Sequence, residues 1–321
     1  MESRGTWTDL VAGVGLQISE VFDQGQEEYT PGINAVLIQT SGDGAEKHFS
    51  GKTGIGRLSR FEEGDDIQVK RRYKTYKTSI SYNFYGTSVQ VTKANIEDRE
   101  FDAQLDEMKD LSVAANFSQD ESGMQLFNGG FATTEVVNSY KLNFYGDAVP
   151  TFSTVHPTVV PGESSQSNAS STGIAFTHDN LETAKVALTL QQTDDGLPLA
   201  LMGKATVVAP INLEREAREI TESALVAENA NNAINVHKGT TDVVTTQFLD
   251  AVNGGSDTAW FLVVPGRTKM YHEVRQAPAL EMDVDILSKN ATFTVDARWT
   301  NYVKDWRRSW GSKGAGAAYS S

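Results

Sequence analysis

The chain has 321 residues, of which 28 are basic and 42 acidic, so its formal net charge is -14. This length suffices for one large domain or two to three modest ones, and the acidic balance argues against general affinity for nucleic acid. Because there is no cysteine, disulfides, thiol nucleophiles and thiolate metal sites are excluded. The longest apolar stretch, at 259–265, is far shorter than the roughly 20 residues of a membrane helix, and the first ten residues lack a secretory signal. The sequence therefore predicts a soluble protein without a membrane span, made in a cytoplasm.

Residues 1–45 carry no sustained hydrophobic period. A short apolar patch at 11–22 is followed by turn formers and charges. We expect an arm that packs on something else and has no core of its own.

Residues 48–93 are rich in Val, Ile, Thr and Tyr in near alternation, which is typical of strands. The turn-forming sequence FEEGDD at 61–66 precedes the alternating run. This pattern predicts an extended hairpin that continues into a core strand.

The clearest helix is predicted from Ile96 to Ser118, with Asn95 as its N-cap and carboxylates in its first turn. Such a helix has some six turns and a length of about 35 Å. Its apolar to small stripe consists of Phe101, Leu105, Met108, Ser112 and Ala115. The following segment extends the helix toward residue 128, and Gly129 and Gly130 are the predicted stop.

The second half mixes helices and strands without a regular βαβ rhythm, so the predicted fold class is α+β. Residues 159–173 form a serine-rich loop that is either mobile or held by a neighbour. Helices are predicted at 180–191 and 212–223, and strands at 204–210, 258–266 and 290–303.

A search for catalytic or cofactor motifs gives negative results. The GKT at 51–53 lacks the upstream glycine of a phosphate-binding loop, because a glutamate stands in its place. The five histidines are scattered, and most are expected at the surface or in loops. The carboxylate pairs Asp194/Asp195 and Asp283/Asp285 could do acid–base work, but a turn and a strand context favour structural or solvated roles. The sequence therefore predicts no enzyme, no catalytic residue, no cofactor and no metal.

The C-terminal stretch 298–314 places three tryptophans among five basic residues. These side chains could stack on the bases of a single nucleic-acid strand. Alternatively, the tryptophans anchor the last strand in a core while the arginines pair with acidic neighbours. Their place at the end of an alternating strand favours the second interpretation.

Two adjacent blocks carry opposite charge. Residues 67–93 contain six basic and no acidic residues, whereas residues 97–121 contain nine acidic and two basic residues. The basic candidates on the hairpin are Lys70, Arg71, Arg72, Lys74 and Lys77. The acidic candidates on the helix are Glu97, Asp98, Asp102, Asp106, Glu107 and Asp110. We predict that these blocks attract each other, within one chain or between copies, and that the basic segment contacts protein; the alternative is that both are solvated faces.

The order of these parts resembles the major capsid proteins of tailed phages, and specifically the major head subunit of the Mu-type family. The resemblance covers roughly residues 85 to 315 and rests on five stretches: GTSVQVTKANIEDREFDAQLDEM, LNFYGDAVPTFSTVHP, DNLETAKVALTLQQTDDGLPLALMGKATVVAPINLEREAREI, DTAWFLVVPG and ARWTNYVKDWRRSWGSKG. These stretches match the general sequence pattern of the family and carry no catalytic signature. Before residue 85, the N-terminal arm and the hairpin match the family only in their position and general character.

The resemblance implies the fold shared by tailed-phage and herpesvirus shells. Its parts would be an N-terminal arm at 1–45, an extended loop at 46–82, a peripheral domain at 83–180 with a spine helix at 96–128, an axial domain at 181–285, and return strands of the peripheral domain with the C-terminus at 286–321. In this family the extended loop lies across the peripheral domain of the adjacent subunit, which agrees with the predicted charge pairing.

The implied function is that of a structural subunit that self-assembles into hexamers and pentamers of an icosahedral shell around double-stranded DNA. The implied partners are further copies of the chain, a scaffolding protein, a maturation protease, a portal, a decoration protein, and DNA by weak non-specific contact. A separate scaffold is expected, because the chain has no long helical leader. The subunit would assemble in the host bacterial cytoplasm and reside in the virion. The alternatives are an encapsulin-like compartment shell and a phage tail-tube or sheath protein.

Overall fold

The computed structural model describes residues 7–64, 66–67, 69–98, 102–199, 203–225, 234–285, 287–288 and 290–315. The α-helices are α1 (Trp7–Glu28), α2 (Lys93–Asp98), α3 (Asp102–Asn128), α4 (His178–Thr189) and α5 (Glu214–Glu222). The strands are β1 (Ile38–Ser41), β2 (Glu46–Phe49), β3 (Thr78–Ser81), β4 (Asn83–Val91), β5 (Val136–Val137), β6 (Tyr140–Lys141), β7 (Ala205–Pro210), β8 (Thr241–Thr246), β9 (Trp260–Val263), β10 (Lys269–Val284), β11 (Ala291–Asp305) and β12 (Ser309–Ser312). Short 3-10 turns span Gly32–Ala35, Gly129–Phe131, Ile211–Leu213, Gln247–Leu249 and Ala251–Asn253. This mixture confirms the α+β class.

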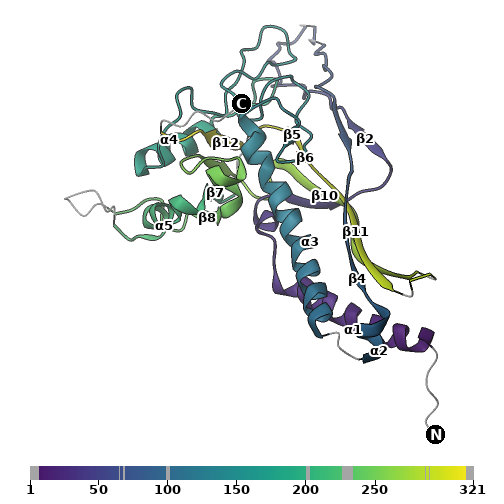
Figure 1. Ribbon diagram of the computed structural model, residues 1–321. Coiled ribbons are helices and arrows are strands. Elements are labelled where there is room, and N and C mark those ends of the chain that lie inside the picture. The colour runs from purple at the N-terminus through teal and green to yellow at the C-terminus, as the bar shows by residue number, and fades with distance from the viewer. Residues whose placement is uncertain are drawn as a thin grey trace.

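The first sheet has the strand order β1-β10-β11-β4. The long antiparallel hairpin of β10 and β11 forms its centre, and α3 runs beside it (Figure 1). Met108 of α3 and Phe293 of β11 are fully buried in the core between helix and sheet. The predicted strand at 290–303 and the predicted core strand after the hairpin, which is β4, are both confirmed. β10 was not predicted, because Pro278 and three register shifts interrupt its alternation.

The second sheet has the strand order β12-β9-β7-β8, and α4 and α5 pack on it. Every residue of β7 is buried, because strands flank it on both edges and its side chains face packed cores. The helices predicted at 180–191 and 212–223 are confirmed as α4 and α5. α4 begins two residues earlier than predicted, with Thr177 as the N-cap whose hydroxyl accepts from the Asn180 N–H at 3.3 Å.

The tryptophans of the C-terminal stretch are core residues. Trp299, Trp306 and Trp310 are 1%, 1% and 4% exposed. Arg307 pairs with carboxylates of the same chain, with Nη2 2.6 Å from Asp194 and Nη1 3.1 Å from Asp305. The structural interpretation of this stretch is therefore confirmed.

The N-terminal segment has no core of its own, as predicted, but it forms a helix that was not predicted, and this α1 packs on α3 of the same chain (Figure 1). Ile18 and Phe22 are buried in the core of the first sheet, and the Ser112 hydroxyl donates to the Phe22 carbonyl at 2.6 Å. A Cβ on Gly25 would lie 2.9 Å from the Cβ of Ser112, so the close approach of the two helices needs glycine there. Glycines in the packed face weakened the periodicity from which a helix is recognised.

The predicted spine helix is confirmed for 102–128 as α3, including its extension to Asn128 and its end at Gly129 and Gly130, whereas residues 96–98 belong to α2. The predicted N-cap is wrong, because α2 already begins at Lys93 and the hydroxyl of Thr92 accepts from the Asn95 N–H at 3.4 Å. Met108 and Ser112 of the predicted stripe are fully buried, whereas Phe101 lies outside the described residues.

Part of the serine-rich loop at 159–173 is held by other segments of its own chain. Asn168 is fully buried, and its side-chain amide donates to the Thr151 carbonyl at 2.8 Å and accepts from the Ser153 N–H at 2.9 Å. Ala169 forms a bridge with Gly311 near the C-terminus. One buried asparagine thus satisfies backbone groups that a loop without regular structure would leave unpaired.

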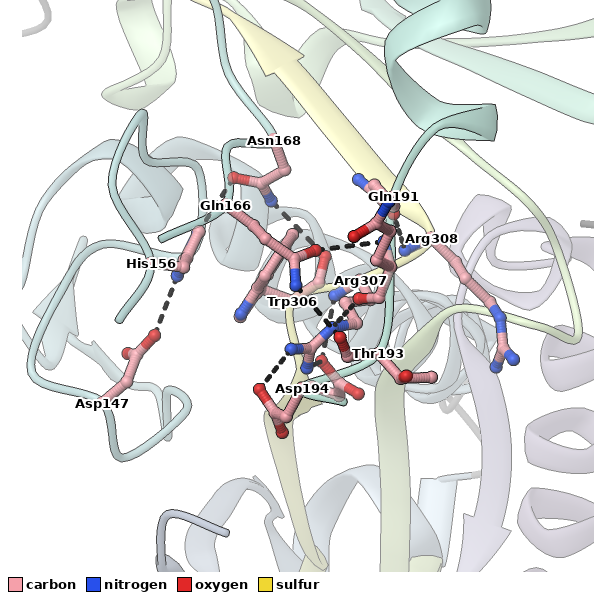
Figure 2. A network of polar contacts seen from close by, with 12 residues as sticks. Asp147, His156, Gln166, Asn168, Gln191, Thr193, Asp194, Trp306, Arg307 and Arg308 are labelled. Atoms are coloured by element: carbon pink, nitrogen blue, oxygen red, sulfur yellow. Dashed lines mark hydrogen bonds and ion pairs between the residues drawn. The ribbon is translucent and has the colours of Figure 1, made fainter. Parts of the chain in front are cut away.

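Three of the five histidines are buried, and two of these, His156 and His237, lie outside helices and strands, as was expected of most histidines. His156, His237 and His272 are 1%, 0% and 1% exposed. His156 stacks on Trp306 with ring centroids 4.1 Å apart, and its Nδ1 lies 2.8 Å from Oδ2 of Asp147 (Figure 2). Both ring nitrogens of His156 have hydrogen-bond partners, because Nε2 lies 3.0 Å from the Asn168 side-chain oxygen, and this compensates for the burial of the ring.

Candidate inter-subunit interface

The segment predicted to contact a neighbour leaves the body on a two-stranded stem. β2 and β3 pair antiparallel, and beyond them the Thr53 N–H donates to the Tyr73 carbonyl at 2.8 Å. The described residues between 54 and 72 form no strand. The predicted extended hairpin is therefore confirmed for the stem and wrong for the tip. At the tip, the described residues have no facing strand against which alternating side chains could pack. We call residues 50–77 the projecting loop.

A buried carboxylate fixes the base of this stem. Glu273 of β10 accepts from Lys47 Nζ at 2.6 Å, from the Tyr302 hydroxyl at 2.9 Å, and from the Tyr82 hydroxyl. Burial alone would raise the pKa of Glu273, but these donors hold it below its usual value. Because Lys47 precedes the projecting loop and Tyr82 follows it, this carboxylate ties both ends of the loop to the first sheet.

A second support lies beneath the projecting loop. Arg307 fixes the turn that carries Asp194 and Asp195, as Figure 2 shows for its ion pair with Asp194. The Asp195 carboxylate in turn lies against Gly54 of the loop. The Asp194/Asp195 pair is therefore structural, as its turn context favoured.

The five basic candidates of the projecting loop, Lys70, Arg71, Arg72, Lys74 and Lys77, are all exposed. Within the described part of the chain, none of them forms an ion pair with a carboxylate. Lys70 instead donates to the Arg57 carbonyl of the same loop. Among the described side chains, this positive charge therefore has no counterion.

The acidic candidates occupy α2 and the first half of α3. Asp106, Glu107 and Asp110 are exposed on α3. Glu97 and Asp98 lie in α2 and Asp102 begins α3, but their side chains fall outside the description. Lys109, on the same stretch of α3, pairs with Glu28 of α1 at 2.7 Å. The fold does not bring the acidic and basic blocks together among the described side chains.

The sequence analysis missed a third feature, which is the apolar character of the loop tip. Leu58 and Val69 are 95% and 93% exposed, and Ile67 is 72% exposed. The signal was present, since large aliphatic residues stood in a stretch with turn formers and no core partner.

A histidine cluster holds α4 against the segment before β8. The His237 ring donates from Nε2 to the His178 carbonyl at 3.2 Å, and its Nδ1 accepts from Lys185 Nζ at 3.3 Å. Glu182 lies 3.9 Å from the same ring. Burial, followed by the neighbouring charges of Lys185 and His178, lowers the pKa of His237, and burial also lowers the pKa of His272.

We expect acid to destabilise the subunit through these two histidines. Their pKa values are about 6.5 in the unfolded chain and lower in the folded chain, so the unfolded state binds more protons below that pH. The contribution of these two histidines to the free energy of unfolding is fully present above about pH 6.5 and is lost as the pH decreases below that value. Melting temperatures from pH 8 to pH 5 measure this, and H237Q should flatten the profile. A profile that is level between pH 7 and pH 5 would contradict the assignment.

The described residues contain no group of three or more histidine or carboxylate side chains placed to hold a metal ion. No helix among them combines the length and the apolar character that crossing a bilayer requires.

The fold of this chain is similar to that of several solved capsid proteins. The chain is similar to the capsid of Ralstonia phage GP4, with 15% identity, a TM-score of 0.53 and coverage of 89% of each chain. It is similar to the capsid of Myoviridae Phage XM1, with 12% identity, a TM-score of 0.54 and coverage of 88% of this chain and 90% of that one. It is also similar to the mature capsid of bacteriophage PhiM1, with 10% identity, a TM-score of 0.54 and coverage of 90% and 89%. The fold is therefore the one shared by tailed-phage capsid proteins.

A family model described as phage capsid protein matches residues 85–309, so the chain belongs to this family. No curated protein matches the chain. The protein is a structural subunit, and not an enzyme, that assembles with further copies of itself into the capsid of the virion. Its place in the Mu-type group remains a prediction.

Proposed function

We propose that the subunit builds hexamers and pentamers of an icosahedral head, and that the projecting loop of each copy lies on α3 of the next. The observation that carries this proposal is the separation of the two charged blocks within one chain. Exposed basic residues stand on the loop without a counterion from a described side chain, and Asp106, Glu107 and Asp110 stand exposed elsewhere on the same surface.

Such a pair of complementary patches on one molecule defines a head-to-tail contact. A contact of this kind joins every copy to the next. It closes into a ring when the rotation between neighbouring copies is an integer fraction of a full turn. Charge complementarity selects the partner and sets its orientation more than it adds affinity. Many modest contacts of this type then hold a shell that no single contact could hold.

The proposed division into parts follows the sequence: an arm at 1–45, a loop at 46–82, a peripheral domain at 83–180 with return strands at 286–321, and an axial domain at 181–285. Strands cross this division in both directions. β10 pairs with β11 in the first sheet, and β12 pairs with β9 in the second. The chain therefore passes between the two sheets more than once, and its strands tie the proposed parts together.

We further propose a scaffolding protein, a maturation protease, a portal and a decoration protein as partners, with assembly in the host bacterial cytoplasm. The packaged double-stranded DNA would touch the wall only weakly. The net charge of -14 supports this last point, because an acidic wall repels phosphates and leaves the genome free to move during packaging.

Electron microscopy of the full chain expressed with its scaffolding protein tests the proposal. We expect closed particles of uniform diameter, with capsomers of six and five subunits resolved after averaging. Open cylinders would instead indicate a tail component, and a subunit that stays monomeric under these conditions would contradict self-assembly.

A further inference from the structure

The ring of His156 is 1% exposed, and both of its nitrogens face oxygen atoms of other side chains (Figure 2). Nδ1 lies 2.8 Å from Oδ2 of Asp147, and Nε2 lies 3.0 Å from Oδ1 of Asn168. A neutral imidazole carries a proton on one nitrogen and a lone pair on the other. The nature of the two facing oxygens therefore decides how many protons the ring holds.

The backbone fixes the orientation of the Asn168 amide. Its Oδ1 accepts from the Ser153 N–H at 2.9 Å, and its Nδ2 donates to the Thr151 carbonyl at 2.8 Å. A flipped amide would set its NH2 group against an N–H and its oxygen against a carbonyl, so both bonds would be lost. The atom that faces Nε2 of His156 is therefore an oxygen. Because this oxygen can only accept, Nε2 carries a proton.

The second facing group is the carboxylate of Asp147, which is 6% exposed. Its Oδ1 accepts from the Val149 N–H at 3.3 Å, and its Oδ2 faces the ring. An ionised carboxylate accepts hydrogen bonds and cannot donate them, so Nδ1 of His156 also carries a proton. A positive ring also compensates for the burial of the negative carboxylate, which would be costly without a cationic partner.

The stacking of the ring supports a positive charge. His156 lies on the indole of Trp306 with ring centroids 4.1 Å apart and planes 8° apart, and the negative face of an indole attracts cations. Arg307 lies over the same indole, with Cζ 4.7 Å from the ring centroid, and pairs with Asp194 and Asp305. Because these two carboxylates neutralise Arg307, the charge of Asp147 is left for His156.

We infer that His156 is a doubly protonated imidazolium in the folded subunit, and that its second proton closes a latch between residues 147–168 and the end of the chain. Asn168 connects the ring to that end. Its Nδ2 lies 3.4 Å from the Trp306 carbonyl, and its own carbonyl accepts from the Gly311 N–H of β12 at 3.0 Å. The inference concerns the single subunit and does not rest on the proposed function.

Loss of this proton opens the latch. The ring would then present a lone pair either to Oδ1 of Asn168 or to the carboxylate of Asp147, and one buried acceptor would lose its donor. In the unfolded chain a histidine is mostly neutral above about pH 6.5. The folded state therefore binds more protons than the unfolded state at neutral pH, and the free energy of unfolding falls as the pH rises.

Two other buried histidines are internal controls, because their partners require only one proton each. His237 donates from Nε2 and accepts at Nδ1. Nδ1 of His272 lies 2.7 Å from Oδ1 of Asn301, and its Nε2 has no hydrogen-bond partner among the described residues. The geometry thus gives His237 a neutral ring with the proton on Nε2 and His272 a neutral ring with the proton on Nδ1.

Nuclear magnetic resonance of the full chain with isotope-labelled histidine tests the assignment, because nitrogen chemical shifts distinguish protonated from unprotonated ring nitrogens. At about pH 7.5, where an exposed histidine is mostly neutral, we expect two protonated nitrogens for His156 and one each for His237 and His272. A His156 ring with one protonated nitrogen at that pH would overturn the inference.

The variant D147N separates charge from packing. The introduced amide can donate to Nδ1, so His156 should become a neutral ring with its proton on Nε2. Between about pH 7 and pH 9, the fall in melting temperature should be reduced by about half, whereas D23N, at an exposed position of α1, should leave it unchanged. An equal fall in D147N and the natural chain would show that no charged latch exists.

Limited proteolysis shows where the chain opens. In the natural chain, cleavage within residues 147–173 should increase between about pH 7 and pH 9 relative to cleavage within residues 50–77, and D147N should remove this increase. A ratio that does not change with pH in the natural chain would contradict the latch.

Discussion

Reversing Lys70, Arg71, Arg72 and Lys74 to glutamate is expected to abolish shell formation while the subunit stays folded. All four side chains are exposed and form no ion pair with a described carboxylate, so their replacement costs the isolated subunit little stability. At the proposed interface the same change would place acidic groups opposite Asp106 and Asp110, and every such contact in the shell would repeat this repulsion. Particle yield by sedimentation and the melting temperature of the unassembled subunit measure the two effects.

Two companion variants test the electrostatic origin of this loss. Replacing the same four residues by glutamine should give an intermediate yield, because the attraction is removed and no repulsion is added. Adding D106K, E107K and D110K to the reversed chain should restore part of the assembly. If the reversed chain formed normal particles, the basic loop residues would not be needed for the contact between subunits. If the helix substitutions restored no assembly, the loop would contact a different partner.

Among the side chains at the base of the loop, Glu273 is expected to contribute most to the free energy of unfolding. Its carboxylate accepts three hydrogen bonds while only 2% of the residue is exposed. E273A leaves the Lys47 ammonium and the two tyrosine hydroxyls without their shared acceptor, so the free energy of unfolding should fall by about 2 to 4 kcal/mol. Denaturant unfolding of the unassembled subunit measures this fall.

The matched control for this variant is E46Q, because Glu46 lies next to Lys47 on β2 but is exposed. Its effect should stay within about 0.5 kcal/mol. The carboxylate also ties both ends of the loop to the sheet, so E273A should increase protease cleavage within residues 50–77 more than E46Q does. Equal stability of the two variants would show that the buried carboxylate does not fix the stem.

Elements with an undisturbed period could be predicted from the sequence. The stripe of α3 and the alternation of β11 are continuous, and both elements lie where they were expected. α1 and β10 were missed because the hydrophobic pattern of each is interrupted. Glycine replaces apolar side chains where α1 meets α3, and bulges with Pro278 break the alternation of β10, so packing and hydrogen bonds decide these elements in spite of a weak local pattern.

The buried polar residues could not be predicted, because no local sequence pattern marks contacts such as those of His156 with residues 9 and 12 positions away. His156 bonds to Asp147 and Asn168 and stacks on Trp306, and only the folded chain brings these four residues together (Figure 2). A single sequence offers only the general preference of histidine for surfaces, which this site overrides.

The candidate interface was predicted in part. Charge is visible in a sequence, so the opposite signs of the loop and of α3 could be identified together with the idea that they meet. The contacts of Glu273 with Lys47 and Tyr82 were invisible in the sequence, because the two partners lie 226 and 191 residues earlier in the chain. The apolar loop tip was visible but was interpreted only as part of a strand pattern.

A cryo-electron microscopy map of the assembled particle, at a resolution that traces side chains, tests the central claim most directly. We predict that residues 55–77 of each subunit cross to the next one, with the basic side chains over Asp106 and Asp110 of that neighbour. A map in which this segment stays on its own subunit, or contacts only solvent, would contradict the proposed mechanism of assembly.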